Sequence, residues 1–172
     1  KEFVIQNLVD ESIDEWFLFF SNKIDLAEQI ESLKHFLDRM DGLNIGRILS
    51  FFNLDYLEKT DKKILNWIDA CAHFSDVFCF SNRNNKNTKA LNLLVDRYKN
   101  MRYPMQTFIL SKKKTPPIDQ ILCQVPRRIS HIFDPLDILE PEETLENDPF
   151  LSRQPNGKRS NPLIIPKWKK NQ

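Results

Sequence analysis

The sequence is poor in glycine and cysteine, with three of each among 172 residues, and none of its ten prolines lies before Pro104. So little glycine excludes a collagen-like repeat, and the chain lacks the long apolar run that a transmembrane helix needs. Three irregularly spaced cysteines argue against a disulfide framework and for a reducing compartment. The apolar fraction of 41%, which includes thirteen Phe, excludes a wholly disordered chain and predicts a packed core.

Charge is strongly segregated along the chain, although the net charge is only +1. The formal charge is −7 over residues 1–80, +8 over 81–114, −6 over 115–150 and +6 over 151–172. Opposite blocks attract each other, so the basic blocks could fold back onto the acidic ones. Alternatively, they orient the encounter with a partner.

The proline-free part of the chain is typical of helices. Apolar residues recur every three or four positions over residues 26–40, which predicts a helix that ends near Gly42. Similar patterns predict four more helices, over residues 1–20, 45–56, 61–80 and 88–103. We therefore expect an all-α domain over residues 1–104, either an antiparallel helical bundle or an α-solenoid slice of about five helices.

The proline-rich part predicts an extended C-terminal arm. We expect residues 105–150 to form an acidic docking arm with short helical turns, and residues 105–110 to be a short strand or extended piece. Residues 151–172 form a basic tail that contains Pro and Trp. The arm has too many apolar residues for an inert linker, so we expect it to dock into grooves of its own helices or of another protein. The predicted partner-binding residues are Leu122, Ile132, Phe133, Leu136, Leu139, Phe150, Ile164 and Trp168.

Two basic clusters are candidates for nucleic-acid contact. Lysine and arginine neutralise phosphates, and an aromatic ring such as Trp168 can stack on an unpaired base. The C-terminal cluster also fits a docking peptide or a nuclear-import signal. The candidate nucleic-acid-binding residues are Lys112, Lys113, Lys114, Lys158, Arg159, Lys167, Lys169 and Lys170.

No catalytic motif is found in the sequence, neither a P-loop, G-x-G-x-x-G, G-x-S-x-G nor H-E-x-x-H. Cys71 and His73, two positions apart on an expected helix, would point to different faces, and Cys79 lies in an apolar run. We expect them to be core residues. Arg127 and Arg128 with His131 could in principle serve an RNA-cleaving site, but such clusters arise often by chance. The sequence therefore predicts no enzyme, no metal and no cofactor.

The apolar run from Trp16 to Phe20 is preceded by acidic residues that anionic lipid would repel. This favours core burial or a partner interface over a membrane surface.

We therefore expect a non-catalytic scaffold or assembly subunit of a multiprotein complex, associated with nucleic acid in the nucleus. Its partners would be other protein subunits, with RNA or DNA as a further candidate and no membrane. Two alternatives stay open: a direct RNA- or DNA-binding protein that uses residues 81–114 and 151–172, and an accessory domain of an enzyme whose active site lies outside this sequence. Because the first residue is Lys1 and no leader precedes the first element, we also expect a portion of a longer protein.

Overall fold

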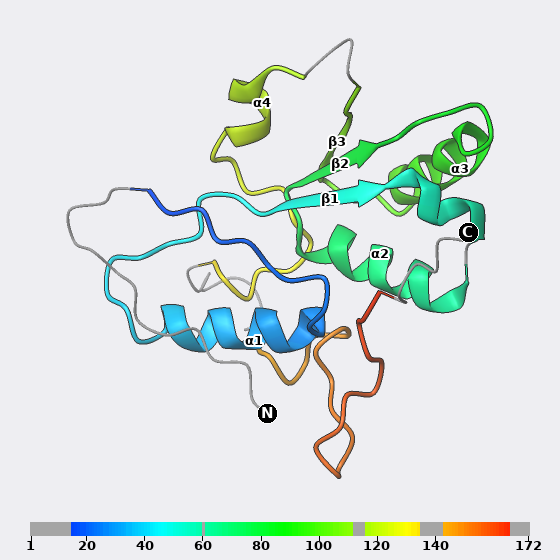
Figure 1. The fold of residues 1–172 in the computed structure, drawn as a ribbon. Coiled ribbons are helices and arrows are strands. Elements are labelled where there is room, and N and C mark those ends of the chain that lie inside the picture. Colours follow the sequence, from blue (N-terminus) through cyan, green and yellow to red (C-terminus); the bar gives the residue numbers. More distant parts are fainter. Residues whose placement is uncertain (1–14, 60, 112–115, 135–142, 166–172) are drawn as a thin grey trace. The chain divides into compact units, whose positions relative to one another are not determined.

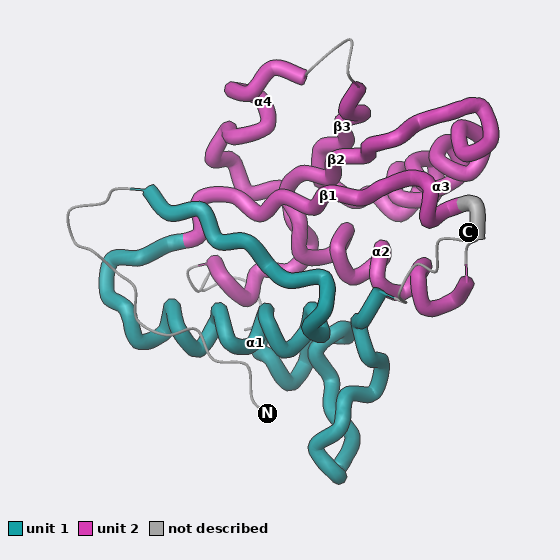
Figure 2. Tube along the Cα trace, viewed as in Figure 1, with its two compact units in different colours: residues 1–44, 135–172 teal, residues 45–134 magenta. Residues whose placement is uncertain are grey.

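A computed structural model describes residues 15–59, 61–111, 116–134 and 143–165. The chain divides into two compact units (Figure 2). Unit 1 combines residues 1–44 with residues 135–172, and unit 2 consists of residues 45–134.

Unit 2 is a small α/β unit built on a parallel sheet (Figure 1). Three strands pair in the order β1-β2-β3, so each strand lies beside the one that follows it in sequence. A helix connects each strand to the next, as parallel strands require. The elements of unit 2 are β1 (Leu49–Asn53), the 3-10 helix η1 (Leu54–Lys59), α2 (Lys62–Phe74), β2 (Val77–Ser81), α3 (Thr88–Asn100), β3 (Gln106–Ile109) and α4 (Ile118–Leu122).

Both connecting helices cover the same face of this sheet. Phe52, Phe80 and Ile109 form one row across the strands, because Phe52 pairs with Phe80 and Phe80 pairs with Ile109. Phe52 packs against Trp67 of α2, with 6.0 Å between the ring centroids. At the other end of the row, Phe80 and Ile109 share a groove with Leu91 of α3.

Strand β2 lies at the centre of the core. Its residues Val77, Phe78, Cys79 and Phe80 have no exposed surface, as expected for a central parallel strand that is covered on both faces. The helix before it begins at a capping residue, since the Asp61 carboxylate accepts hydrogen bonds from the backbone N–H groups of Lys63 and Ile64. Asp61 thus sets the start of α2.

The predicted all-α fold is wrong, because the described structure contains a parallel sheet with helices. The helix expected over residues 45–56 is instead β1 followed by η1, and the helix expected over residues 61–80 ends at Phe74, before β2. A continuous apolar run of four or five residues looks the same in a buried strand and in a buried helix. Ser75 and Asp76 break the second helix, and the chain after them is extended.

Other predicted elements are confirmed. Helix α3 begins at Thr88, β3 occupies four residues of the extended piece expected over residues 105–110, and α1 (Leu26–Leu37) covers most of the helix expected over residues 26–40. The helix expected over residues 1–20 is wrong for its described part, since residues 15–20 form neither helix nor strand. Residues 1–14 lie outside the described residues.

Unit 1 is held together by contacts between α1 and the C-terminal segment. The backbone N–H of Leu26 donates to the carbonyl of Leu163, and the N–H of Leu163 donates to the Asp25 carboxylate, which also caps α1. Residues 153–159 form a tight hairpin with Gly157 at a φ of +78° in its turn. This segment therefore packs on the chain's own helix rather than extending away from it.

Candidate protein-interaction surface

The clearest candidate surface in unit 1 is the apolar segment that precedes α1. The side chains of Trp16, Phe17, Leu18 and Phe19 are 42%, 67%, 55% and 88% exposed. Soluble proteins rarely expose several large apolar side chains in a row unless another surface covers them. Of the two uses expected from the sequence, core burial is excluded for these four residues, and a partner interface remains.

The position of this segment is set by the turn that follows it. The buried side chain of Gln29 in α1 donates to the carbonyls of Ser21 and Ile24 and accepts from the Ser21 N–H. No backbone hydrogen bond joins residues 16–20 to other described parts of the chain. The turn therefore anchors the C-terminal end of the segment. The backbone groups of residues 16–20 have no hydrogen-bond partner in other described parts of the chain.

A second candidate surface lies in unit 2, at the outer edge of β3. Because the N–H groups of Gln106 and Leu110 donate to the carbonyls of Asp76 and Phe80, those of Thr107 and Ile109 point away from β2. A groove of about 310 Å³ lies beside this edge. It is lined by Phe80 of β2, Leu91, Val95 and Lys99 of α3, and Thr107 and Ile109 of β3.

The loop between β2 and α3 is a third candidate, of a polar kind. Asn87 is buried and orders the loop, since its side chain donates to the carbonyl of Asn82 and accepts from the N–H of Asn84. Arg83 and Lys86 of this loop are exposed. The loop lies at the carboxyl end of a parallel strand and beside a helix N-terminus, which is where α/β proteins commonly bind phosphate-bearing ligands.

The structure distributes the predicted partner-binding residues over both units. Leu122 and Ile164 are 40% and 47% exposed, Phe133 and Phe150 are half-buried, and Ile132 is only 2% exposed. Their use by a partner stays a prediction. The other three, Leu136, Leu139 and Trp168, lie outside the described residues.

Among the predicted nucleic-acid-binding residues, Lys158 is exposed and Arg159 is buried. The Arg159 guanidinium lies 2.7 Å from Glu28 and 2.6 Å from Glu31 of α1, and Arg153 contacts the same two carboxylates. The folding of the basic tail onto the acidic block is thus confirmed for these two arginines. The others, Lys112, Lys113, Lys114, Lys167, Lys169 and Lys170, lie outside the described residues.

Arg128 does not offer its charge to an RNA phosphate. Its guanidinium is buried in unit 2, where it pairs with the carboxylates of Asp76 and Asp134, and His131 contacts Asp134 at 2.9 Å. These contacts hold the segment after α4 to the start of β2. Arg128 therefore has a structural role, whereas the side chain of Arg127, the residue before it, is exposed.

Cys71 and Cys79 are core residues, as the sequence predicts. Burial raises the pKa of the Cys71 thiol to about 12, with a small opposing effect from a hydrogen bond to Ser50, and raises the pKa of Cys79 to about 11. Both thiols therefore stay protonated and unreactive at neutral pH.

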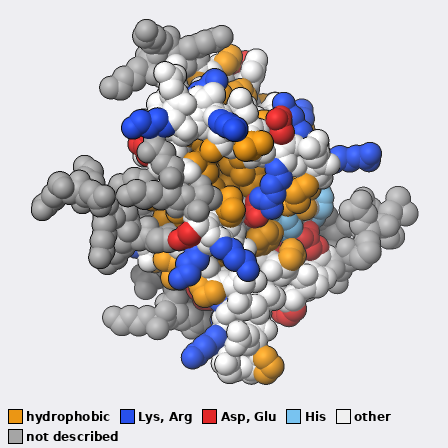
Figure 3. Space-filling model, turned by 90° about the vertical axis from the view of Figure 1, so that its right-hand side faces the viewer, with side chains coloured by type: hydrophobic (Ala, Val, Ile, Leu, Met, Phe, Trp, Pro, Cys, Tyr) orange, Lys and Arg blue, Asp and Glu red, His pale blue; other side chains and the backbone are white. Residues whose placement is uncertain are grey.

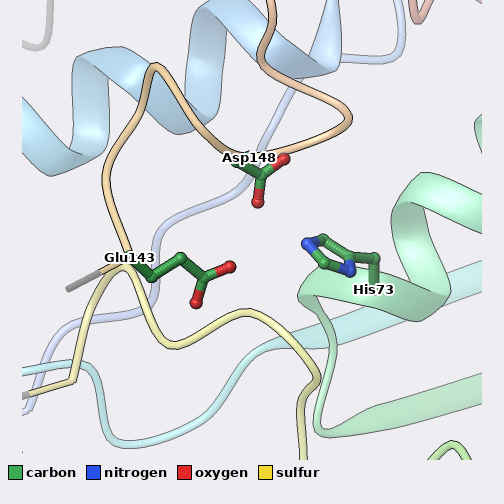
Figure 4. A group of neighbouring side chains, drawn as sticks. All are labelled: His73, Glu143 and Asp148. Carbon is green, nitrogen blue, oxygen red and sulfur yellow. The ribbon is translucent and has the colours of Figure 1, made fainter. Parts of the chain in front are cut away.

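Figure 4 draws three side chains of types that bind metal ions. Glu143 and Asp148 belong to unit 1, whereas His73 belongs to unit 2. Asp148 already has a local role, because its carboxylate accepts a hydrogen bond from the N–H of Phe150.

No family model, curated protein or solved structure matches this chain. Among the described residues, no helix combines the length and the apolar composition that crossing a bilayer requires. Hydrophobic side chains do reach the surface, and Figure 3 shows a face on which they gather among Lys and Arg side chains. The function is therefore inferred from the exposed surfaces of the protein.

Proposed function

We propose that this protein is a non-catalytic assembly subunit that binds other protein subunits through the apolar segment from Trp16 to Phe20. The exposure of Trp16, Phe17, Leu18 and Phe19, between 42% and 88%, carries the proposal. Each aromatic side chain can remove about 150–250 Å² from water on binding, which makes such a row a strong anchor. The exposed Leu122 and Ile164 of the expected arm are further anchors of the same kind. We also propose that the protein acts in the nucleus, since its C-terminal basic cluster fits a nuclear-import signal.

The segment lies outside every helix and strand of the described chain, so its side chains can be changed without breaking an element. The test compares the double variant Phe17→Ser/Phe19→Ser with a matched control, Phe51→Ser/Leu93→Ser. The control removes two side chains that are 60% and 64% exposed elsewhere in the molecule. Both double variants replace two exposed apolar side chains by serine.

The measurement is chemical cross-linking in cells followed by purification of the tagged full-length protein, with and without nuclease. We expect the wild type and the control to retain the same cross-linked proteins, and Phe17→Ser/Phe19→Ser to lose them. Retention of every cross-linked protein by that variant would contradict the proposal. Loss on nuclease treatment alone would show that nucleic acid, rather than protein, bridges the complex.

Direct binding of RNA or DNA is a second candidate function. It is supported by the exposed Arg83 and Lys86, which lie in the ordered loop between β2 and α3. Replacing both residues by Gln should lower nucleic-acid affinity and reduce the slope of log K against log salt by about 1.4–1.8, since each phosphate contact contributes about 0.7–0.9. The matched control is Lys62→Gln/Lys63→Gln, which removes two exposed charges at the start of α2. Equal slopes for both variants would rule out this use of the loop. An accessory role in an enzyme stays the third hypothesis.

A further inference from the structure

The exposed segment and the β3 edge have complementary chemistry. We propose that residues Trp16–Phe20 of one copy of this chain add as a strand to the β3 edge of a second copy. This inference rests on the proposed function and names the partner as a second copy of the same chain. Its support comes from backbone groups, side chains and charge.

The backbone argument concerns unpaired hydrogen-bonding groups. Thr107 and Ile109 direct their N–H and C=O groups away from β2, and no hydrogen bond to the described chain pairs them. The backbone groups of residues 16–20 likewise have no hydrogen-bond partner in other described parts of the chain. An exposed edge strand is a template for pairing with another chain, and the added strand gains affinity from main-chain hydrogen bonds.

The side-chain argument concerns the groove beside this edge. Thr107 and Ile109 point to the face that carries α3, and the groove continues over Leu91 and Val95. Ile109 is 40% exposed in a single chain. In an added strand, alternate side chains point to the same face. Either Phe17 and Phe19, or Trp16, Leu18 and Phe20, would therefore enter the groove.

The charge argument concerns the residues that flank each surface. The segment is preceded by Asp10, Glu11, Asp14 and Glu15. The β3 strand follows the exposed Lys99 and Arg102 in sequence and precedes Lys112–Lys114. In the sequence, β3 thus has basic residues on both sides, which complement the acidic residues that precede the segment. Asp96 is the acidic side chain that lines the groove, and Lys99 lies beside it.

A reciprocal exchange would make a closed dimer, since each copy has one segment to donate and one edge to accept. Two aromatic rings per segment bury about 150–250 Å² each. Counted in both directions, with the surface that they cover, this reaches the roughly 1,200 Å² of a small specific interface. A closed dimer is held by two such contacts, whereas neighbouring copies in an open chain would share only one.

The first experiment measures the mass of the full chain in solution by sedimentation over a range of concentrations. We expect a dimer for the wild type. Thr107→Pro removes an N–H that points outward, which an edge strand tolerates, and also replaces a side chain that lines the groove; it should raise the dissociation constant about tenfold or more. The control Thr107→Val keeps the N–H and should dimerise like the wild type.

Phe17→Ser/Phe19→Ser provides a second route to the same result, because these residues lie outside every element. At concentrations at which the control Phe51→Ser is dimeric, Phe17→Ser/Phe19→Ser should be monomeric. A wild type that is monomeric at all concentrations, or a folded Thr107→Pro that dimerises like the wild type, would overturn the inference.

The second experiment identifies the contact. In a Cys123→Ser background, a copy labelled with a heavy isotope that carries Leu18→Cys is mixed with an unlabelled copy that carries Thr107→Cys, and a short bismaleimide links close cysteines. Cross-linked peptides that join labelled to unlabelled copies support the exchange. If the variant with both cysteines, tested alone, is linked only within one chain, the segment docks on its own molecule and the second copy is excluded.

The two proposals fail in distinguishable ways. If the wild type is monomeric but Phe17→Ser/Phe19→Ser loses its cellular cross-links, the second copy is wrong and the proposed function stands. If that variant changes neither the mass nor the cross-links, both are wrong.

Discussion

Asp76 and Arg128 form a fully buried ion pair in unit 2, with 3.0 Å between Asp76 Oδ2 and Arg128 Nη1. The same carboxylate accepts hydrogen bonds from the backbone N–H groups of Ile48 and Arg127, at 2.7 and 2.6 Å. Asp76 immediately precedes β2. Its carboxylate contacts Ile48, Arg127 and Arg128, and thus joins three parts of the chain that are distant in sequence. A buried charge whose partner is removed is left without compensation, so this pair should be sensitive to substitution.

Asp76→Asn should lower the free energy of unfolding by about 3 kcal/mol, because it leaves the Arg128 charge with Asp134 alone. Urea denaturation followed by circular dichroism measures the change. Asp38→Asn is the control, since Asp38 forms an exposed ion pair with Lys34 that is worth about 0.5 kcal/mol or less. Equal effects of the two substitutions would contradict the structural role of the buried pair.

Phe51 and Phe52 are adjacent in β1, but truncation of Phe52 should destabilise the fold far more than truncation of Phe51. Phe52 is 3% exposed and packs on the helix-covered face, so Phe52→Ala should cost about 3–5 kcal/mol of stability. Phe51 is 60% exposed on the other face, and Phe51→Ala should change stability by about 0.5 kcal/mol or less. Thermal unfolding compares the two variants. If Phe52→Ala does not fold, Phe52→Leu takes its place, and it should still destabilise more than Phe51→Ala. A similar loss for both positions would show that the strand alternation is wrong.

Protonation of Glu31 should contribute to a loss of folding stability at acid pH. Burial by itself raises the pKa of this carboxyl, but hydrogen bonds from Arg159 and Arg153, and their charges, outweigh burial and leave the pKa below its ordinary value of 4.5. A group with a lowered folded-state pKa contributes stability above its unfolded pKa and loses it as the pH falls through the folded pKa. The wild type should therefore lose stability as the pH falls below 4.5, and Glu31→Gln should lose less.

Denaturation midpoints measured between neutral pH and strongly acid pH give this comparison for Glu31. Glu15→Gln, which changes an exposed carboxyl, serves as the control and should retain the wild-type dependence. An identical pH profile for Glu31→Gln and the wild type would rule out the contribution of the ion-pair cluster.

The three cysteines should differ in reactivity. Cys123 is exposed, whereas burial raises the pKa of Cys71 to about 12 and that of Cys79 to about 11. Iodoacetamide at mildly alkaline pH should therefore label only Cys123 in the folded protein, and all three cysteines in denaturant. Mass spectrometry of the peptides reads the result, and Cys123→Ser should stay unlabelled when folded. Native labelling of Cys71 at a rate close to that of Cys123 would contradict the buried core.

Local patterns in the sequence predicted several elements well. The apolar stripe of α1, the Asp61 cap of α2, the start of α3 at Thr88 and the extended piece at β3 all follow from nearest neighbours in the chain. The alternation of helical stretches with apolar runs at residues 49–53 and 77–81 was a signal for a β-α-β arrangement. Periodicity could not separate these two segments from helices, because both are short, the first mixes apolar and polar residues, and the second is apolar at four successive positions.

The candidate surfaces were predicted only in part. The acidic flank and the apolar run at Trp16–Phe20 are visible in the sequence, but their exposure depends on whether any other part of the chain covers them. Arg159 shows the converse. It belongs to a basic run that predicts contact with phosphates, yet its charge is neutralised by Glu28 and Glu31, more than 120 residues earlier.

The sequence by itself determined where helices begin, which residues are apolar and how charge is divided along the chain, since these depend on a residue and its near neighbours. Tertiary structure alone decided that Val77–Ser81 is a central strand, that Arg128 and Arg159 are neutralised, and that one apolar run is buried while another is exposed. The physical reason is that burial and ion pairing depend on residues far apart in the chain, whose meeting is fixed only when the sheet and the C-terminal hairpin have formed.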